Sequence, residues 1–390
     1  MTAPRLPCFD ISRLPGVGDD HRAIQEAVRR FVESEIAPFA DAWDEAECFP
    51  RELYRKAAEV GILGLGYPAE YGGTPADAVA KLLATIEMSR GGIGGVKASL
   101  GSHGIMLGPL MVGAQASVRE AVVPRILAGD RIGALAITEP SGGSDVAQLQ
   151  TRAQPVPGGW RLNGSKMFIT SGMRADHILV AARTGGPGAA GISLFLVDGD
   201  SPGLTRTPLR KIGWWASDTA ALYFDDLFVP GDRLVGAENA GWTLAMRNFN
   251  GERMTMAAGA LGFAMICVED ALAWARERRT FGQRLIDHQT IRQKLVRMID
   301  EVLPVQAWVL QLAQRLDAGE SPAGDLALAK NHAARLMRDC ADGAVQILGG
   351  AGFLRGSRIE RAWRDSKVFM IGGGAEEVMN ELAARQLGLV

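Results

Sequence analysis

The chain has 390 residues, of which 47% are hydrophobic, and its 42 basic and 44 acidic side chains give a formal net charge of −2 at pH 7. This length exceeds what one hydrophobic core usually serves, so two or three domains are expected. The balanced charge offers neither the basic field that nucleic acid attracts nor a polybasic anchor for a membrane, which favours small-molecule chemistry.

Cysteine spacing and the N-terminal composition predict a reducing, cytoplasmic location. Residues 1–20 carry prolines and acids without an apolar core or an Arg-rich amphipathic pattern, so neither a secretory signal nor a transit peptide is evident. No C-x-x-C pair occurs among the four cysteines, which argues against a disulfide framework, a zinc ribbon or an iron–sulfur cluster. The four cysteines are Cys8, Cys48, Cys267 and Cys340.

The first third of the chain has helical patterns. Apolar residues recur with helical spacing in four segments, at residues 21–36, 51–60, 76–89 and 118–128. Pro38 ends the first pattern and glycines end the others. The longest stretch free of Asp, Glu, Lys and Arg, residues 98–118, contains Ser, His, Gln, Pro and several glycines, so it predicts buried helix and loop and no membrane span. We expect an N-terminal helical domain over residues 1–133.

The middle of the chain changes to short β-rich runs. These are separated by turns rich in Gly, Pro, Asn and Asp, and they lie at residues 160–162, 178–182, 192–197 and 221–228. The pattern predicts a small β domain over residues 134–237. Beyond Gly241, long helical patterns return, with breaks near residues 279–282, 319–322 and 349–352. Long helices joined by short loops are typical of a bundle.

The expected fold class is therefore α+β. It comprises an N-terminal α-helical domain, a small middle β domain and a C-terminal four-helix bundle over residues 238–390.

Two stretches of the β domain carry the candidate chemistry. In residues 134–145, Ala-Leu-Ala-Ile-Thr-Glu-Pro-Ser-Gly-Gly-Ser-Asp, an apolar run stops at Pro140, which cannot donate an amide to a central strand. The two glycines that follow allow the backbone to approach a ligand closely. The stretch thus offers extended backbone and the hydroxyl of Thr138 to a ligand.

The second stretch is Asn-Gly-Ser-Lys-Met-Phe-Ile-Thr-Ser-Gly at residues 163–172. Asn163-Gly164 predicts a two-residue hairpin turn. Thr170 adds a hydroxyl and Phe168 an aromatic ring, and a flat heteroaromatic cofactor such as a flavin needs these groups. Taken alone, either stretch also fits a surface hairpin or turn.

Together, the two stretches resemble the acyl-CoA dehydrogenases. The family patterns Thr-Glu-Pro-x-x-Gly-Ser-Asp and Asn-Gly-x-Lys-x-x-Ile-Thr stand at residues 138–145 and 163–170, and the likeness spans nearly the whole chain. The resemblance implies FAD as cofactor, an acyl-CoA substrate, an electron-transfer flavoprotein as acceptor and a homotetramer built as a dimer of dimers.

Two later motifs extend the resemblance. Residues 278–282 are similar to the family's Arg-x-x-Phe-Gly and residues 346–350 to its Gln-x-x-Gly-Gly, which in relatives reach the FAD of a neighbouring subunit. An arginine can neutralise a pyrophosphate and glycines admit close backbone contact; without the family, these residues fit a helix-end charge and a helix stop. The FAD contacts that the resemblance implies are Leu135, Ile137, Thr138, Ser144, Phe168, Thr170, Arg278, Phe281, His288, Gln289, Gln346, Gly349, Gly350 and Glu377.

Dehydrogenation of an acyl thioester between Cα and Cβ requires a base for the α-proton. A carboxylate in an apolar slot suits this task because desolvation raises its pKa. In many relatives this glutamate lies in a Tyr-Glu-Gly-Thr stretch near the C-terminus, where this chain has Gly372-Gly373-Gly374-Ala375. In the isovaleryl and long-chain branches the base precedes an arginine at the start of the first long C-terminal helix, where Glu252-Arg253 stands here.

The helix that carries Glu252 is predicted to begin at Asn250, which fits an N-cap position. Glu252 would then lie in the first turn, where the positive helix end favours the anion by roughly 0.3–1 kcal/mol and burial favours the neutral acid. Burial prevails if substrate closes the site. Without the resemblance, Glu252 fits a helix-dipole partner. The implied substrate contacts are Ser144, Asn250, Arg253 and Gly373.

Other site classes find no support. The five histidines show no paired spacing, so a metal site is not expected. No G-x-G-x-x-G follows a strand, and neither a Walker A run nor a G-x-S-x-G elbow occurs, which excludes the nicotinamide, nucleotide-hydrolysis and serine-hydrolase classes.

The leading hypothesis is an FAD-dependent acyl-CoA dehydrogenase of fatty acid β-oxidation, an oxidoreductase that forms trans-2-enoyl-CoA. Glu252 would take the α-proton, flavin N5 the β-hydride, and electron-transfer flavoprotein the electrons. Two alternatives stay open: a flavin-dependent oxidase or monooxygenase on the same fold, and a non-catalytic member of the family, which Gly373 motivates. Acyl chain length and branching also stay open.

Overall fold

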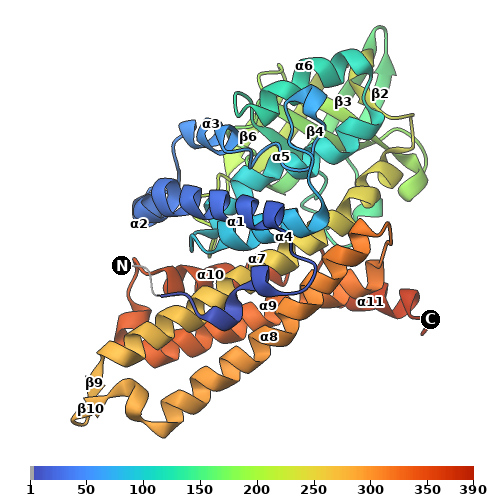
Figure 1. Cartoon of the computed structure of the whole chain (residues 1–390). Coiled ribbons are helices and arrows are strands. Elements are labelled where there is room, and N and C mark those ends of the chain that lie inside the picture. The colour runs from blue at the N-terminus through green and yellow to red at the C-terminus, as the bar shows by residue number, and fades with distance from the viewer. Residues whose placement is uncertain (1–3) are drawn as a thin grey trace.

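The computed structural model describes residues 4–390, except for the side chain of Asn248. Helices, a sheet and a second set of helices follow one another along the chain, as Figure 1 shows. This order confirms the predicted α+β class.

The N-terminal part is helical. Its main helices are α1 (Asp19–Phe31), α2 (Ala40–Glu45), α3 (Glu52–Glu59), α4 (Ala78–Ser89), α5 (Gly94–Gly113) and α6 (Ala116–Leu127). The four segments predicted from apolar spacing correspond to α1, α3, α4 and α6. The charge-free stretch lies mostly in α5, much of which is buried. Asp77 caps α4, since its side chain accepts the amide of Ala80 at 2.8 Å.

The middle part is a mainly antiparallel sheet. Its strands are β1 (Gly133–Ala136), β2 (Arg152–Val156), β3 (Gly159–Ile169), β4 (His177–Arg183), β5 (Ile192–Asp198), β6 (Leu204–Pro208), β7 (Ala220–Pro230) and β8 (Leu234–Val235). They lie in the order β6-β7-β3-β2-β4-β5-β8, and β1 pairs in parallel with β4. Both faces of β4 and β5 are buried: Leu179 and Leu194 pack against α5 and α6, whereas Val180 and Phe195 pack against β3 and β7.

The predicted hairpin at Asn163-Gly164 is wrong. The β2–β3 turn lies earlier, at Pro157-Gly158, because Val156 pairs with Gly159, and Gly158 supplies the positive φ of +82°. β3 continues through Asn163-Gly164 with a shift in register against β7. Glycine is needed at 164 because a Cβ there would lie 2.7 Å from the Cα of Thr151.

The C-terminal part is a bundle of long helices. They are α7 (Gly241–Glu277), α8 (Gln289–Asp317), α9 (Ala323–Leu348), α10 (Arg358–Phe369) and α11 (Glu376–Gln386), and a small hairpin of β9 (Arg279–Thr280) and β10 (Gln283–Arg284) joins α7 to α8. α7 is long and apolar enough to cross a bilayer, but 83% of its apolar window is buried in the protein. We interpret α7 as the central helix of the bundle.

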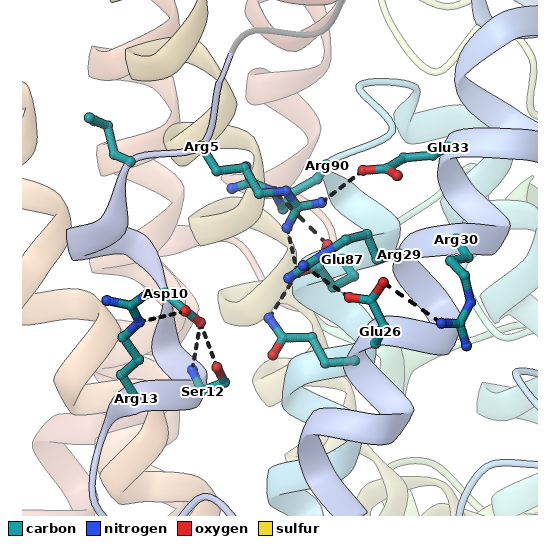
Figure 2. Close-up of polar contacts among 12 residues, drawn as sticks. Arg5, Asp10, Ser12, Arg13, Glu26, Arg29, Arg30, Glu33, Glu87 and Arg90 are labelled. Carbon is teal, nitrogen blue, oxygen red and sulfur yellow. Dashed lines mark hydrogen bonds and ion pairs between the residues drawn. The ribbon is translucent and has the colours of Figure 1, made fainter. Parts of the chain in front are cut away.

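Buried charges fasten the N-terminal segment across the junction of α4 and α7. Arg5 donates to the buried carboxylate of Glu87 on α4 at 2.8 Å, as Figure 2 shows. The amide of Leu6 donates to Glu269 on α7 at 2.9 Å. Arg90 completes the link by pairing with Glu269 at 2.6 Å. Burial acts to raise the pKa of Glu87, but Arg5 and the neighbouring cations hold it below its ordinary value. The bundle and the N-terminal helices are therefore held in one arrangement.

Candidate active site

The two β-domain stretches singled out from the sequence lie side by side. The amide of Met167 donates to the carbonyl oxygen of Thr138 at 2.8 Å. The buried ammonium of Lys166 donates to the carbonyl oxygen of Ile137 at 2.9 Å and to the Glu139 carboxylate at 2.8 Å. Burial lowers the pKa of Lys166 to about 8 although Glu139 acts to raise it. The glutamate and lysine of these motifs are thus structural: they join the end of β1 to β3.

Phe168 presents an aromatic ring outward from this junction. Its backbone has a φ of +62°, which is uncommon for a residue other than glycine, and its side chain is 67% exposed. Such a conformation costs on the order of 1–3 kcal/mol and tends to occur at functional sites. Thr138 and Thr170 lie half-buried beside it, whereas Ser144 is exposed in the turn after β1. An outward ring flanked by hydroxyls fits one end of a planar cofactor such as a flavin.

Glu252 lies inside α7, which corrects the predicted helix start. α7 begins at Gly241, where a Cβ would lie 2.7 Å from the carbonyl carbon of Ser193, so Asn250 is an interior residue and not an N-cap. The helix-end effect is confined to the first turn. Burial is therefore the main influence, and it raises the pKa of the Glu252 carboxyl.

The charge that acts on Glu252 comes from Lys97 on α5. Among the described residues, Lys97 is the charged group that opposes the rise in the Glu252 pKa. Burial lowers the pKa of Lys97 itself to about 8, against the influence of Glu252. Both side chains lie largely within the protein, and each keeps part of its surface accessible to solvent.

Two other parts of the chain pack against α7, one before and one after Glu252. Leu135 and Ile137 of the β1 stretch pack in one apolar cluster with Ala245 and Phe249 of α7. Further along α7, Met256 lies beside the loop that follows α10: a Cβ on Gly373 would be 3.2 Å from its Cγ. The two alternative positions for the base thus border the same face of α7.

Two of the predicted substrate contacts, Asn250 and Arg253, lie within two residues of Glu252 on α7. Arg253 donates to the side-chain oxygen of Asn250 at 2.8 Å, and its buried Nε has no hydrogen-bond partner within the described part of the chain. Lys330 donates to the carbonyl oxygen of Gly374 at 2.6 Å and is influenced by the charge of Arg253. Burial lowers the pKa of Lys330 to about 8. This pair of cations beside the loop fits an anionic group of a ligand.

The later FAD motifs lie at the other end of the bundle. Arg278 directly follows α7, and at about 1.5 Å per residue the helix separates it from Glu252 by about 39 Å. Figure 1 shows the β9–β10 hairpin far from the sheet. Phe281 at its tip is 97% exposed, with a φ of +51°. The remaining residues of this group are His288 and Gln289 at the start of α8, and Gln346, Gly349 and Gly350 at the end of α9.

One chain therefore does not bring all the predicted FAD contacts together. Glu377 is exposed in the first turn of α11, and the β1–β3 junction and the β9–β10 end are separate. Exposed residues at the β9–β10 end are free to reach a second subunit. This arrangement fits the expectation that these motifs act across a subunit boundary.

Sequence reasoning missed two buried groups. Lys97 is the single Lys, Arg, Asp or Glu between residues 91 and 118, and that isolation was the available signal. Asp365 on α10 accepts the amides of Trp214 at 2.6 Å and Gly94 at 3.1 Å. Burial raises the pKa of Asp365 to about 7. Nothing in its sequence neighbourhood indicated this.

Comparisons with known proteins cover the whole length. Models of the N-terminal, middle and C-terminal domains of acyl-CoA dehydrogenases match residues 18–130, 134–227 and 239–388. The long-chain specific acyl-CoA dehydrogenase of Rattus norvegicus mitochondria is 33% identical, over 99% of this chain and 90% of that protein.

Solved structures agree with these matches. A probable acyl-CoA dehydrogenase from Mycobacterium abscessus superposes with a TM-score of 0.93 at 43% identity, covering 95% of this chain and 99% of that one. A glutaryl-CoA dehydrogenase from Mycobacterium smegmatis, solved in complex with FADH2, gives a TM-score of 0.93 at 29% identity, covering 100% and 99% of the two chains.

Proposed function

Since the chain belongs to the acyl-CoA dehydrogenases, a flavin-dependent family of oxidoreductases, we propose that Glu252 is the base of an acyl-CoA dehydrogenation. Glu252 removes the α-proton of the thioester as the β-hydride leaves, and the product is trans-2-enoyl-CoA. FAD, when bound, supplies the hydride acceptor at N5. An electron-transfer flavoprotein takes the electrons onward.

The placement of Glu252 carries this proposal. A general base works best when its pKa lies near the working pH, and burial raises the pKa of this carboxyl from its ordinary 4.5. The Glu252 side chain keeps part of its surface accessible, so a ligand can reach it. Gly373, the position of the base in other relatives, has no side chain to serve instead.

The surrounding residues position the thioester. Within the described part of the chain, the amide of Gly373 has no backbone acceptor, so it is available to a thioester oxygen, whose developing charge a backbone amide stabilises. Arg253, with Asn250 beside it, binds an anionic part of CoA, and Ser144 contributes a further substrate contact from the β domain in this proposal.

The cofactor contacts come from two subunits in this proposal. The first subunit contributes the β1–β3 junction and the second the β9–β10 end with the neighbouring end of α9, since the two lie too far apart in one chain. A homotetramer built as a dimer of dimers provides such pairs. The chain residues assigned to FAD are those named for it above.

Steady-state assays of Glu252→Gln test the proposal. The variant should purify yellow and bind acyl-CoA but lose dehydrogenation with an artificial electron acceptor. Full activity in this variant would overturn the assignment of the base. Rapid reoxidation of the reduced wild type by air in the presence of product would favour an oxidase, and FAD that no acyl-CoA reduces would favour a non-catalytic protein.

A further inference from the structure

Three successive glycines, Gly372-Gly373-Gly374, lie in the loop between α10 and α11. Glycine loses more backbone freedom on folding than any other residue, so such a run does not keep one conformation by itself. The proposed function nevertheless needs the amide of Gly373 in a fixed direction, because a backbone donor stabilises a thioester oxygen through its preset orientation. The loop therefore requires anchors from the surrounding structure.

Backbone hydrogen bonds anchor the loop at its two ends. On the α10 side, the amide of Gly372 donates to the carbonyl oxygen of Val368 at 2.7 Å. On the α11 side, the amide of Glu376 donates to the carbonyl oxygen of Met370 at 3.2 Å. Within the described part of the chain, no backbone–backbone hydrogen bond reaches the Gly373-Gly374 segment between them. The segment that carries the required amide is thus the one that the backbone leaves unanchored.

Lys330 on α9 supplies an anchor at this point. Its side chain is buried, and its Nζ donates to the carbonyl oxygen of Gly374 at 2.6 Å. Among the described residues, this is the one hydrogen bond from a side chain to the backbone of residues 371–375. The neighbouring Asn331 extends the contact to α11 by donating to the carbonyl oxygen of Glu376 at 2.9 Å. One face of α9 therefore holds the loop and the start of α11.

The charge of Lys330 is not explained by this hydrogen bond alone. Burial is the largest influence on its pKa, which it lowers; Glu376 and Glu377 of α11 act to raise the pKa, and Arg253 of α7 acts to lower it. The acceptor at hydrogen-bond distance is a neutral carbonyl. Removing an ammonium from water costs more free energy than one such hydrogen bond returns. A buried cation kept at this position indicates a task in the site and not a gain in stability.

We propose that Lys330 is a positioning residue for the dehydrogenation, which fixes the Gly374 carbonyl and so keeps the amide of Gly373 directed toward the thioester oxygen. Only the backbone dihedral angles of two residues separate these two groups. With the amide of Gly372 bonded on the other side, fixing the carbonyl restricts the directions that the Gly373 amide can take. This inference rests on the proposed function and adds a residue to it.

Steady-state assays of Lys330→Met with an artificial electron acceptor test the proposal. The variant should lower kcat about tenfold or more, which is less than the roughly 10²–10³-fold loss expected when a whole oxyanion donor is removed. Calorimetry in the Glu252→Gln background measures acyl-CoA binding without turnover. There, Lys330→Met should change the dissociation constant less than about threefold, because the thioester oxygen gains its charge only in the transition state.

Two further variants separate positioning from general stability. Lys330→Arg keeps a cationic donor and should retain more activity than Lys330→Met. Lys211→Met is the matched control, since Lys211 also donates from its Nζ to a backbone carbonyl oxygen, that of Ser217 at 2.8 Å, in the loop between β6 and β7. It should lower the unfolding temperature and leave kcat as in wild type.

Isotope-edited infrared spectroscopy reads the Gly373 hydrogen bond without turnover. Flavin-loaded protein is mixed with a trans-2-enoyl-CoA that carries ¹³C at the thioester carbonyl. In wild type, the carbonyl stretching frequency should be lower than in free ligand, because the amide polarises the bond. In Lys330→Met it should move back toward the free value, whereas Lys211→Met should leave it unchanged.

Each outcome has one meaning. An unchanged kcat or an unchanged carbonyl frequency in Lys330→Met, or a loss of kcat with equally weakened acyl-CoA binding, would overturn the assignment of Lys330 and leave the dehydrogenase function standing. If Lys330→Met does not fold, Lys330→Gln, which is polar and uncharged, carries the same predictions. Failure of every acyl-CoA to reduce the wild-type flavin would instead overturn the proposed function itself.

Discussion

The Cγ of Met256 lies 3.2 Å from the position that a Cβ on Gly373 would occupy. Gly373 also has a φ of +67°, a conformation that side chains rarely adopt. The loop after α10 is therefore built for glycine, and a glutamate there meets both backbone strain and the methionine. The base cannot simply move between its two family positions in this chain.

Transplanting the base should consequently rescue little. We expect Glu252→Gln/Gly373→Glu to recover less than about a tenth of wild-type kcat and to lose about 1–2 kcal/mol of unfolding free energy from strain at the positive φ. Adding Met256→Ala should raise the recovered rate. Steady-state assays and urea unfolding measure both effects, and near-complete rescue without Met256→Ala would show that the loop tolerates a side chain.

The pH dependence of kcat/KM should report the environment of Glu252. The base must be ionised, so activity falls as the pH drops through its pKa, and burial places this acid limb above pH 4.5. Lys97 holds the pKa down. In Lys97→Met, assayed with an unbranched acyl-CoA, the limb should therefore move to higher pH. A limb that stays in place or moves to lower pH would contradict the coupling of the two groups.

Asp365 should make stability depend on pH. Its pKa is raised to about 7 in the folded protein from an ordinary 3.8, so its contribution is complete at low pH and is lost as pH rises toward 7. The unfolding free energy of wild type relative to Asp365→Asn should fall by on the order of 4 kcal/mol between about pH 4 and 7. Urea unfolding across this range measures the difference, and a constant difference would refute it.

The Lys166–Glu139 ion pair joins the two β-domain stretches. Substituting one of its two residues should destabilise the protein as much as breaking other buried ion pairs does. Lys166→Met leaves the Glu139 carboxylate without its cation, and breaking a buried pair costs about 3–5 kcal/mol. We expect thermal unfolding at lower temperature and less bound flavin. Lys166→Met/Glu139→Gln removes the stranded charge and should recover part of the loss, whereas a double variant as unstable as the sum of the single variants would show that the two groups act independently.

Hybrid oligomers test the two-subunit cofactor site. Arg278→Ala should lower flavin affinity, and Glu252→Gln should lower turnover. Co-expressing the two with different tags forms sites that combine Glu252 of one chain with Arg278 of the other, so the purified hybrid should regain activity. Hybrids as inactive as either parent would place both residues in one chain's site.

Local patterns predicted much of this molecule. The helical segments before residue 134 and the apolar run of β1 occur in the structure as predicted. Each of them buries the apolar residues on which its prediction was based. The hairpin prediction at Asn163-Gly164 was wrong because a bulge between strands uses the same residue types as a hairpin turn. Only the pairing of Val156 with Gly159 shows that the turn lies elsewhere. Asn250 misled because the apolar helix already extends back to Gly241.

What the sequence could not supply was which charges face each other. Lys97 and Glu252 come from helices far apart in the chain, and their interaction depends on how α5 packs against α7. Asp365 similarly acquires its environment from Trp214 in the loop between β6 and β7 and from Gly94 at the start of α5. The order of elements and the family motifs are local properties of the sequence, whereas the pKa values of buried groups arise only from the packed structure.

The central claim is that Glu252 removes the α-proton, and anaerobic rapid mixing of flavin-loaded protein with acyl-CoA tests it most directly. Loss of the flavin absorbance should be at least about 10²–10⁴-fold slower in Glu252→Gln than in wild type, with flavin content and acyl-CoA affinity retained. Bleaching of the variant at the wild-type rate would contradict the account.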